Sequence, residues 1–255
     1  IYDTVKNDFT VENAFYPPMD NDLTLHDPMV VYEASLAAAK TLLRGRKNID
    51  IIVLSGVWHS IGLFNPNLDP VTPIMQWSNT KASDQAEAFR SKPQLTREYY
   101  NLTGGYPNAI YPFFKLAFLK EEGYNISSYI TMGQATYNFY RLTGSIKVSR
   151  CMASGSGLVN ITTGEYDPKL LEVISLEPSQ LPETVDNDYQ APLSAQAAAS
   201  LGLPAGIPVV PAMSDGSLNQ LGSGALREGQ MTLSVGTSGA LRVTSPQPQL
   251  HPDMS

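Results

Sequence analysis

One stretch of the sequence, residues 208–242, constrains the fold more than any other. Short apolar runs, turns and a helical segment follow one another in it, in the order strand, Ser214-Asp215-Gly216, helix, strand, Gly236-Thr237-Ser238-Gly239, strand. A short apolar run followed directly by a helix is typical of sheets whose strands alternate with helices. The stretch therefore predicts an α/β fold in which Asp215 lies where a buried strand ends and a helix begins.

The rest of the chain repeats this alternation. Residues 49–56 are a β-branched run ending in Gly56 and predict a second buried, parallel strand. Before it, apolar residues recur at three- and four-residue steps, so a helix is expected over 29–46. Further helices are expected at 81–90, 111–122, 137–142, 168–175, 192–201 and 216–227, and further strands at 155–164, 207–212, 231–235 and 240–243.

Charge and composition exclude several classes of protein. The 255 residues carry 17 Lys and Arg against 24 Asp and Glu, a net charge of −7, which does not suit a nucleic-acid backbone as a partner. With 42% hydrophobic residues, the chain has enough apolar material for a packed core. The longest uncharged stretch, 189–214, is interrupted repeatedly by proline and is not expected to span a membrane.

The cysteine and histidine content argues against a bound metal. Cys151 is the single cysteine, so it can form neither an internal disulfide nor a thiolate cage. His26, His59 and His251 have no paired spacing, and no metal-ligating residues are predicted. The first residues are charged and lack the apolar core of a signal peptide. We therefore expect a cytoplasmic protein; a homodimer is left open.

Asp215 is the leading candidate for a catalytic group. A ligand can reach the carboxyl edge of an open α/β sheet. The helix N-terminus there favours the ionised carboxylate, which keeps it available as a base. The alternative is that Asp215 only caps the helix, and on local sequence alone this common role is the favoured one.

Two other turns carry candidate binding residues. Residues 236–239 can direct backbone N–H groups at a phosphate, or can be an ordinary hairpin turn. Trp58 and His59 follow the strand at 49–56, where His59 can hydrogen-bond a polyol while Trp58 stacks on its C–H face; packing of both in the core is equally expected. The sequence has no Walker-type loop, no complete dinucleotide fingerprint and no nucleophile elbow.

Taken in order, several short motifs resemble the FGGY family of carbohydrate kinases, which has the actin-like ATPase, ribonuclease H-like fold. They are His26-Asp27-Pro28, Leu54-Ser55-Gly56-Val57-Trp58-His59-Ser60, Pro73-Ile74-Met75-Gln76-Trp77, Arg141-Leu142-Thr143-Gly144, Ala153-Ser154-Gly155-Ser156-Gly157-Leu158, Ser214-Asp215-Gly216 and Gly236-Thr237-Ser238-Gly239. The resemblance implies ATP-dependent phosphorylation of a sugar or sugar acid, with ATP and Mg²⁺ as cofactors. Within the family the motifs look most like gluconate kinases, which make 6-phosphogluconate from gluconate.

The resemblance also implies residue roles. These are a general base acting on the primary hydroxyl (Asp215), sugar-binding side chains (Trp58, His59, Ser214 and Asn79) and groups lying against the ATP phosphates (Gly236, Thr237 and Ser238). The chain departs from the family pattern at Asn79 and Lys81, where Asp and Arg are usual, and at Ala135-Thr136, where Lys-Asp is common. These departures keep two alternatives open: a kinase for xylulose or another polyol, and a degenerate member that binds a sugar without phosphorylating it.

The resemblance divides the chain into two parts. Residues 1–228 would be the first, sugar-binding domain, without its N-terminal strand and glycine-rich phosphate loop. Residues 229–255 would be the opening hairpin of the second, nucleotide-binding domain. Because transfer needs two domains to close over both substrates, the 255 residues by themselves are expected to be inactive.

Overall fold

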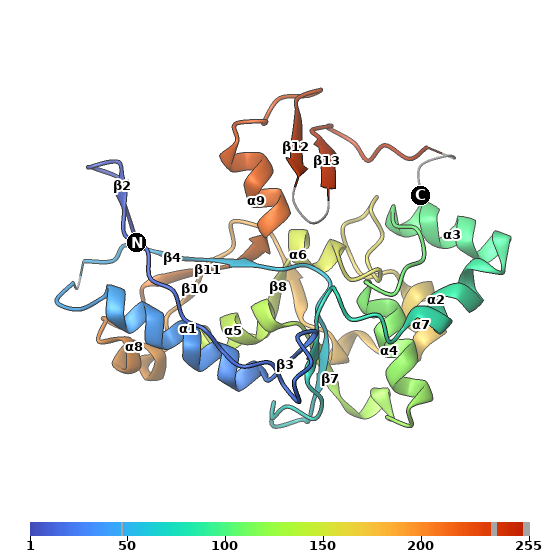
Figure 1. The fold of residues 1–255 in the computed structure, drawn as a ribbon, viewed down its shortest axis with the longest axis horizontal. Coiled ribbons are helices and arrows are strands. Elements are labelled where there is room, and N and C mark those ends of the chain that lie inside the picture. Colours follow the sequence, from blue (N-terminus) through green and yellow to red (C-terminus); the bar gives the residue numbers. More distant parts are fainter. Residues whose placement is uncertain (47, 236–238, 252–255) are drawn as a thin grey trace.

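The chain folds into an α/β structure, as the sequence predicts (Figure 1). The computed structural model describes residues 1–46, 48–235 and 239–251. Its helices are α1 (Pro28–Leu42), α2 (Ser83–Arg90), α3 (Pro93–Thr103), α4 (Pro112–Glu121), α5 (Gln134–Thr143), α6 (Arg150–Ser154), α7 (Pro168–Ile174), α8 (Ala195–Leu201) and α9 (Asp215–Gly222), with 3₁₀ turns at Ile126–Ser128 and Pro178–Gln180. Its strands are β1 (Tyr2–Asp3), β2 (Asp8–Phe9), β3 (Leu25–His26), β4 (Ile52–Gly56), β5 (Gly62–Phe64), β6 (Ile74–Met75), β7 (Ile130–Met132), β8 (Lys147–Ser149), β9 (Glu183–Val185), β10 (Ala191–Pro192), β11 (Pro208–Ser214), β12 (Met231–Val235) and β13 (Gly239–Val243).

A three-stranded sheet in the order β10–β11–β4 positions the candidate site. β4 and β11 run parallel, and Gly56 at the end of β4 is the register partner of Ser214 at the end of β11. β10 pairs antiparallel with the other side of β11. Because the two parallel strands end together, the residues that follow them, Trp58-His59 and Asp215, are brought to the same edge of the sheet.

Helices α1, α5 and α8 cover one face of this sheet (Figure 1). Their apolar side chains pack against Val209 of β11, which is fully buried, and against Ile52 and Leu54 of β4. The helices predicted for these three segments are confirmed, with ends that differ from the predicted ones by a few residues. The parallel strand expected at 49–56 is confirmed, and its parallel partner is β11, which contains the strand expected at 207–212.

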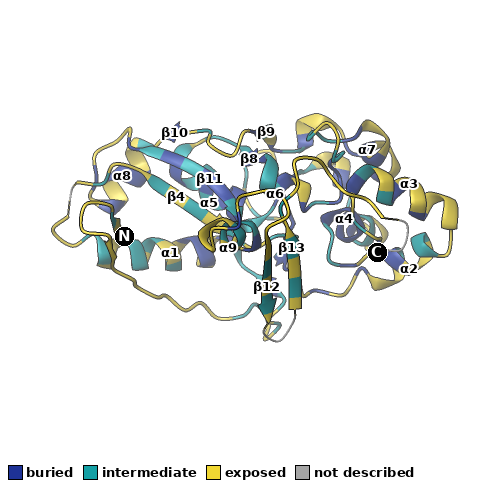
Figure 2. Cartoon of the chain, turned by 90° about the horizontal axis from the view of Figure 1, so that it is seen from above, coloured by how far each residue is buried: buried dark blue, intermediate teal, exposed yellow. Residues whose placement is uncertain are grey.

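The burial of β4 differs from the prediction of a buried strand. Ile52 and Leu54 are half-buried, whereas Ile51 and Val53 are exposed, Val53 to 61%. Figure 2 shows exposed and intermediate positions along β4. In the described part of the chain β4 is an edge strand, and the helices packed on its sheet cover the other face. Its alternate side chains therefore meet solvent, as they do in any sheet covered on one side.

A second group of elements packs around α4, beside the sheet (Figure 1). Phe113 and Phe114 of α4 are buried against α2, α3 and α7, and both rings contact Phe89 of α2 and Tyr99 of α3. Helix α3 is absent from the predicted elements, although the proline at its first position and the left-handed glycine after its end are both helix-boundary signals.

Residues 155–164 do not form the predicted strand. They follow α6 as a compact turn, in which Gly157 and Gly164 have φ values of +71° and +72°. An isolated β-bridge joins Val159 to Tyr166. Because left-handed backbone cannot continue an extended strand, the apolar residues of this segment are buried from a turn instead.

The C-terminal part of the chain follows the sequence pattern closely. β12 and β13 form the expected antiparallel hairpin. The uncharged stretch 189–214 supplies β10, α8 and β11. Within residues 1–46, 48–235 and 239–251, no helix combines the length and apolar character needed to cross a membrane.

Candidate active site

Asp215 is the first residue of α9 and follows β11 directly. Its side chain is exposed, and its Oδ1 accepts a hydrogen bond of 2.8 Å from the adjacent backbone N–H of Gly216. The helix cap is supplied by the preceding residue: the hydroxyl of Ser214 accepts from the backbone N–H of Ser217 at 3.0 Å. The interpretation of Asp215 as a mere N-cap is therefore wrong, and its carboxylate is presented to solvent at the sheet edge.

Ser214 itself is not placed to bind a ligand. It is fully buried, and its hydroxyl donates to the side chain of Ser217 at 2.7 Å while accepting from the backbone of the same residue. We therefore correct its assignment from a sugar-binding residue to the cap of α9, which fixes where Asp215 begins the helix.

Replacing Ser214 by alanine separates these two roles. We expect Ser214→Ala to lower the free energy of unfolding by about 1 kcal/mol, as loss of a cap does, and to leave the affinity for sugar unchanged. Ser194→Ala is the matched control, because Ser194 caps α8 in the same way and lies near the start of β11, at the opposite end of the strand from Asp215. Calorimetry with a sugar that the wild type binds checks this, and a selective loss of sugar affinity in Ser214→Ala would restore the original assignment.

Trp58 and His59 form a turn just beyond β4. His59 has a φ of +67°, a left-handed conformation that is uncommon for a residue with a side chain. Its Nδ1 lies 2.6 Å from the carbonyl oxygen of Gly155, and the indole Nε1 of Trp58 donates to the carbonyl of Cys151 at 2.7 Å. Both rings are half-buried and held by α6 and the residue after it.

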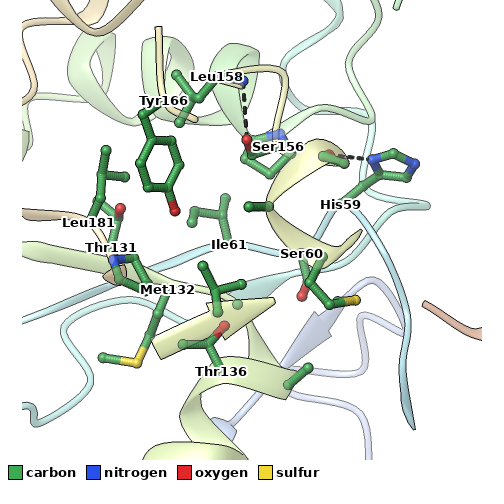
Figure 3. Close-up of a pocket in the computed structure, with 18 residues that line it drawn as sticks. His59, Ser60, Ile61, Thr131, Met132, Thr136, Ser156, Leu158, Tyr166 and Leu181 are labelled. Atoms are coloured by element: carbon green, nitrogen blue, oxygen red, sulfur yellow. Dashed lines mark hydrogen bonds between the residues drawn. The ribbon is translucent and has the colours of Figure 1, made fainter. Parts of the chain in front are cut away.

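A small cavity adjoins this turn (Figure 3). Its volume is about 50 Å³, and its walls include His59, Ser60, Gly155 and Thr136, while the hydroxyl of Tyr166 points into it. Sites that enclose drug-sized ligands are commonly about 300 Å³ or more, so this cavity by itself is too small for a sugar. Asp215 and Trp58 are not part of its wall.

The pKa of His59, which lies just beyond β4, depends on burial and on charged groups that include Asp215 at the end of β11. Burial lowers the pKa of His59, the hydrogen bond with Gly155 raises it, the charge of Lys115 lowers it and the charge of Asp215 raises it, with burial the largest effect. His59 is therefore neutral near pH 7 and able to donate or accept a hydrogen bond at its second ring nitrogen. The charge of Asp215 also acts on this imidazole, which agrees with the two residues lying at the same edge of the sheet.

Asn79, in contrast, is not brought to this site. Its side chain is 1% exposed. Its Nδ2 donates to Thr24 at 2.8 Å, and its Oδ1 accepts from the backbone of Lys81 at 3.1 Å. Both ends of the amide are used to hold the loop after β6, so we correct the assignment of Asn79 as a sugar-binding residue.

The proposed phosphate turn, Gly236, Thr237 and Ser238, lies outside the described residues. The hairpin that carries it packs beside the start of α9: a Cβ added to Gly216 would lie 2.7 Å from a guanidinium nitrogen of Arg242 in β13. Arg242 also donates to Ser234 across the hairpin at 3.2 Å. Among the described residues, no group of three or more His, Cys, Asp or Glu side chains could hold a metal ion.

Comparison with known proteins identifies the class of protein that has this fold and these residues at the carboxyl edge of its sheet. Residues 6–222 match the N-terminal domain of the FGGY family of carbohydrate kinases. The chain belongs to this family, and its fold is the α/β, actin-like ATPase fold that the resemblance implies.

Particular relatives are similar over most of the chain. The gluconokinase of Bacillus subtilis (strain 168) is 27% identical over 93% of this chain and 48% of its own length. The xylulose kinase of Staphylococcus xylosus is 26% identical over 84% and 45%. The crystal structure of gluconate kinase from Lactobacillus acidophilus superimposes with a TM-score of 0.87 and 25% identity over 93% of this chain and 49% of that one. The chain thus spans about half the length of the relatives it matches.

Proposed function

We propose that the protein phosphorylates a sugar acid with ATP, converting gluconate to 6-phosphogluconate. The observation that carries this proposal is the exposed carboxylate of Asp215 at the carboxyl edge of the sheet, with helix capping left to Ser214. In this role Asp215 accepts the proton of the primary hydroxyl, whose oxygen attacks the terminal phosphorus of ATP as ADP leaves. Such transfer depends mainly on positioning and on neutralising charge.

Other residues of the chain would hold the two substrates. Trp58 and His59 lie at the same sheet edge as Asp215 and would bind the sugar, the neutral imidazole by hydrogen bonding and the indole by stacking. Gly236, Thr237 and Ser238 would lie against the phosphates of ATP. Mg²⁺ would enter with ATP in this proposal and offset the negative charge of its phosphates.

Gluconate is favoured over xylulose by two indications. The His59-Ser60 pair and the string beginning at Ser214 look most like gluconate kinases, and the gluconokinase of Bacillus subtilis is among the relatives. A xylulose or other polyol kinase is the second candidate, supported by the xylulose kinase of Staphylococcus xylosus at almost the same identity. We also propose a cytoplasmic location; a homodimer stays a prediction.

A coupled assay of ADP release by the full-length protein tests the proposal. Gluconate, xylulose, glycerol and rhamnulose are supplied in turn with ATP and Mg²⁺. Highest kcat/KM with gluconate is the expected result, and a higher value with another sugar would favour the second candidate. If no sugar is turned over, the proposed catalysis is wrong, and calorimetry that still detects sugar binding would identify a non-catalytic, sugar-binding protein.

The hairpin supports the proposed division of the chain at residue 228. Cross-strand pairing puts Met231 opposite Val243 and Leu233 opposite Leu241 on one face, and all four side chains are exposed. The face turned toward α9 is polar, and the side chain of Thr232 there hydrogen-bonds Gln220. A hairpin with its apolar face outward is unfavourable in water, so we propose that this face is the first layer of a second domain's core and that residues 1–255 alone are inactive.

The substitution Leu233→Ser tests the proposed division of the chain at residue 228. In the full-length protein we expect Leu233→Ser to lower the free energy of unfolding by about 2 kcal/mol, the value of burying a leucine side chain. Val5→Ser is the control, because Val5 is 94% exposed near the N-terminus and should change little. Denaturation followed by circular dichroism measures both; equal stabilities would mean that the apolar face of the hairpin stays in solvent.

A further inference from the structure

Lys115 is a fully buried lysine in the middle of α4. Its Nζ donates to the backbone carbonyls of His59 at 2.8 Å, Gln76 at 2.6 Å and Ile110 at 2.9 Å. Among the described residues, no carboxylate lies within ion-pair distance of it. Three carbonyls are the full complement that an ammonium group can satisfy, so this side chain is held entirely by backbone.

The three carbonyls belong to three segments that meet around the ammonium group of Lys115. His59 lies in the turn after β4, Gln76 directly follows β6 and precedes Trp77, and Ile110 precedes α4. The next residue, Tyr111, packs its ring edge-on against the imidazole of His59 at 5.1 Å between centroids. A single ammonium group therefore connects the segment that carries His59 to both of its neighbours.

The His59 turn needs such a connection, because its backbone is held in the left-handed region. That conformation is unfavourable for a residue with a side chain and persists where the surroundings impose it. Two contacts hold this residue: the carbonyl of His59 accepts from Lys115, and its ring lies within hydrogen-bond distance of the carbonyl of Gly155. The first sets the backbone, and the second sets the side chain.

A buried ammonium group without a carboxylate is costly to keep. Burial lowers the pKa of Lys115 to about 7, whereas three carbonyl acceptors favour the protonated form, which alone has three protons to donate. An apolar side chain would fill the same volume at lower cost. A contribution to stability therefore does not account for a lysine at this position, whereas a role in positioning the backbone segments that it contacts does.

We propose that Lys115 is a positioning residue of the sugar site, which fixes the left-handed backbone of His59 and thereby the direction of its imidazole. It acts through His59 and does not touch the sugar. The assignment of a sugar to this site rests on the proposed function, whereas the effect of Lys115 on the conformation of His59 does not.

The first test compares Lys115→Met with Lys120→Met in the full-length protein. Methionine fills the same space without donating, and Lys120 lies on the same helix, where it donates to the exposed hydroxyl of Ser175. We expect Lys115→Met to raise the KM for sugar by about tenfold or more, as misplacement of a binding group does, with the KM for ATP unchanged. Lys120→Met should change neither. An unchanged KM for sugar, or an equal rise in both KM values, would overturn the proposal.

The second test needs no activity. Glycine relieves left-handed strain, so His59→Gly is introduced with and without Lys115→Met, and unfolding midpoints are measured in urea. If Lys115 imposes the conformation, His59→Gly shifts the unfolding midpoint more favourably in the wild-type background than in the Lys115→Met background. The effects of the two substitutions on stability are then not additive. Ser175→Gly, at another residue with positive φ, should combine additively with Lys115→Met. Additivity at His59 would contradict the proposal even if the kinase activity were established, and coupling there would support it even if no sugar were turned over.

Discussion

Asp215→Asn in the full-length protein is expected to lower kcat for sugar phosphorylation by about 10²- to 10⁴-fold, the usual contribution of a general base. Asparagine keeps the shape of the side chain and cannot accept the hydroxyl proton. The KM values for sugar and ATP should change much less than kcat, because Trp58, His59 and the proposed phosphate turn are untouched. ADP release at saturating sugar and ATP is the measurement.

The fold should survive this substitution. Asp215 is exposed and its neighbour Ser214 caps α9, so the loss is limited to the favourable charge at a helix start, about 0.3–1 kcal/mol. Asp188→Asn is the matched control: an exposed aspartate in the loop before β10, for which we expect wild-type kcat. If Asp215→Asn and Asp188→Asn had the same kcat, Asp215 could not be the base.

Gly155→Ala is expected to have the second largest effect, on sugar affinity. A Cβ at this position would lie 2.5 Å from Cδ1 and 2.8 Å from Cγ of the Trp58 indole. The carbonyl of Gly155 also holds the imidazole of His59. Since the new methyl must push the indole aside or move that carbonyl, we expect the KM for sugar to rise about tenfold or more and the free energy of unfolding to fall by about 1–3 kcal/mol from overpacking.

The control for this change is the same substitution at Gly222. A Cβ there meets nothing within 4 Å, and neither glycine has the left-handed φ that a side chain would strain. Gly222→Ala should therefore leave the kinetics unchanged and, lying in α9, should stabilise the protein slightly. Steady-state kinetics and urea denaturation of both variants make the comparison; wild-type sugar affinity in Gly155→Ala would mean that the Trp58–His59 turn does not bind the sugar.

Much of the fold could be predicted because its signals are local. The periodicity of α1, the β-branched runs of β4 and β11 and the glycine after α5 each lie within a few residues of the element they specify. The turn at 155–164 was missed, because an apolar run predicts burial without distinguishing a strand from a turn, and the left-handed Gly157 decides between them.

The candidate site was predicted less completely, for a physical reason. Asp215 could be placed because its position depends on a strand end and a helix start that adjoin it in sequence. Ser214 and Asn79 are chemically suitable sugar ligands, but which way such a side chain points depends on packing: one turns inward to cap a helix, and the other holds its own loop.

By itself, then, the sequence determined the order of α1, β4, α8, β11 and α9 and the acid where β11 ends, since each depends on neighbouring residues. Only the tertiary structure decided what surrounds His59. Its ring partner Gly155 is 96 residues away and its backbone partner Lys115 is 56 residues away in the chain. Hydrogen bonds between such distant residues form only when packing brings their segments together, and no local pattern carries that information.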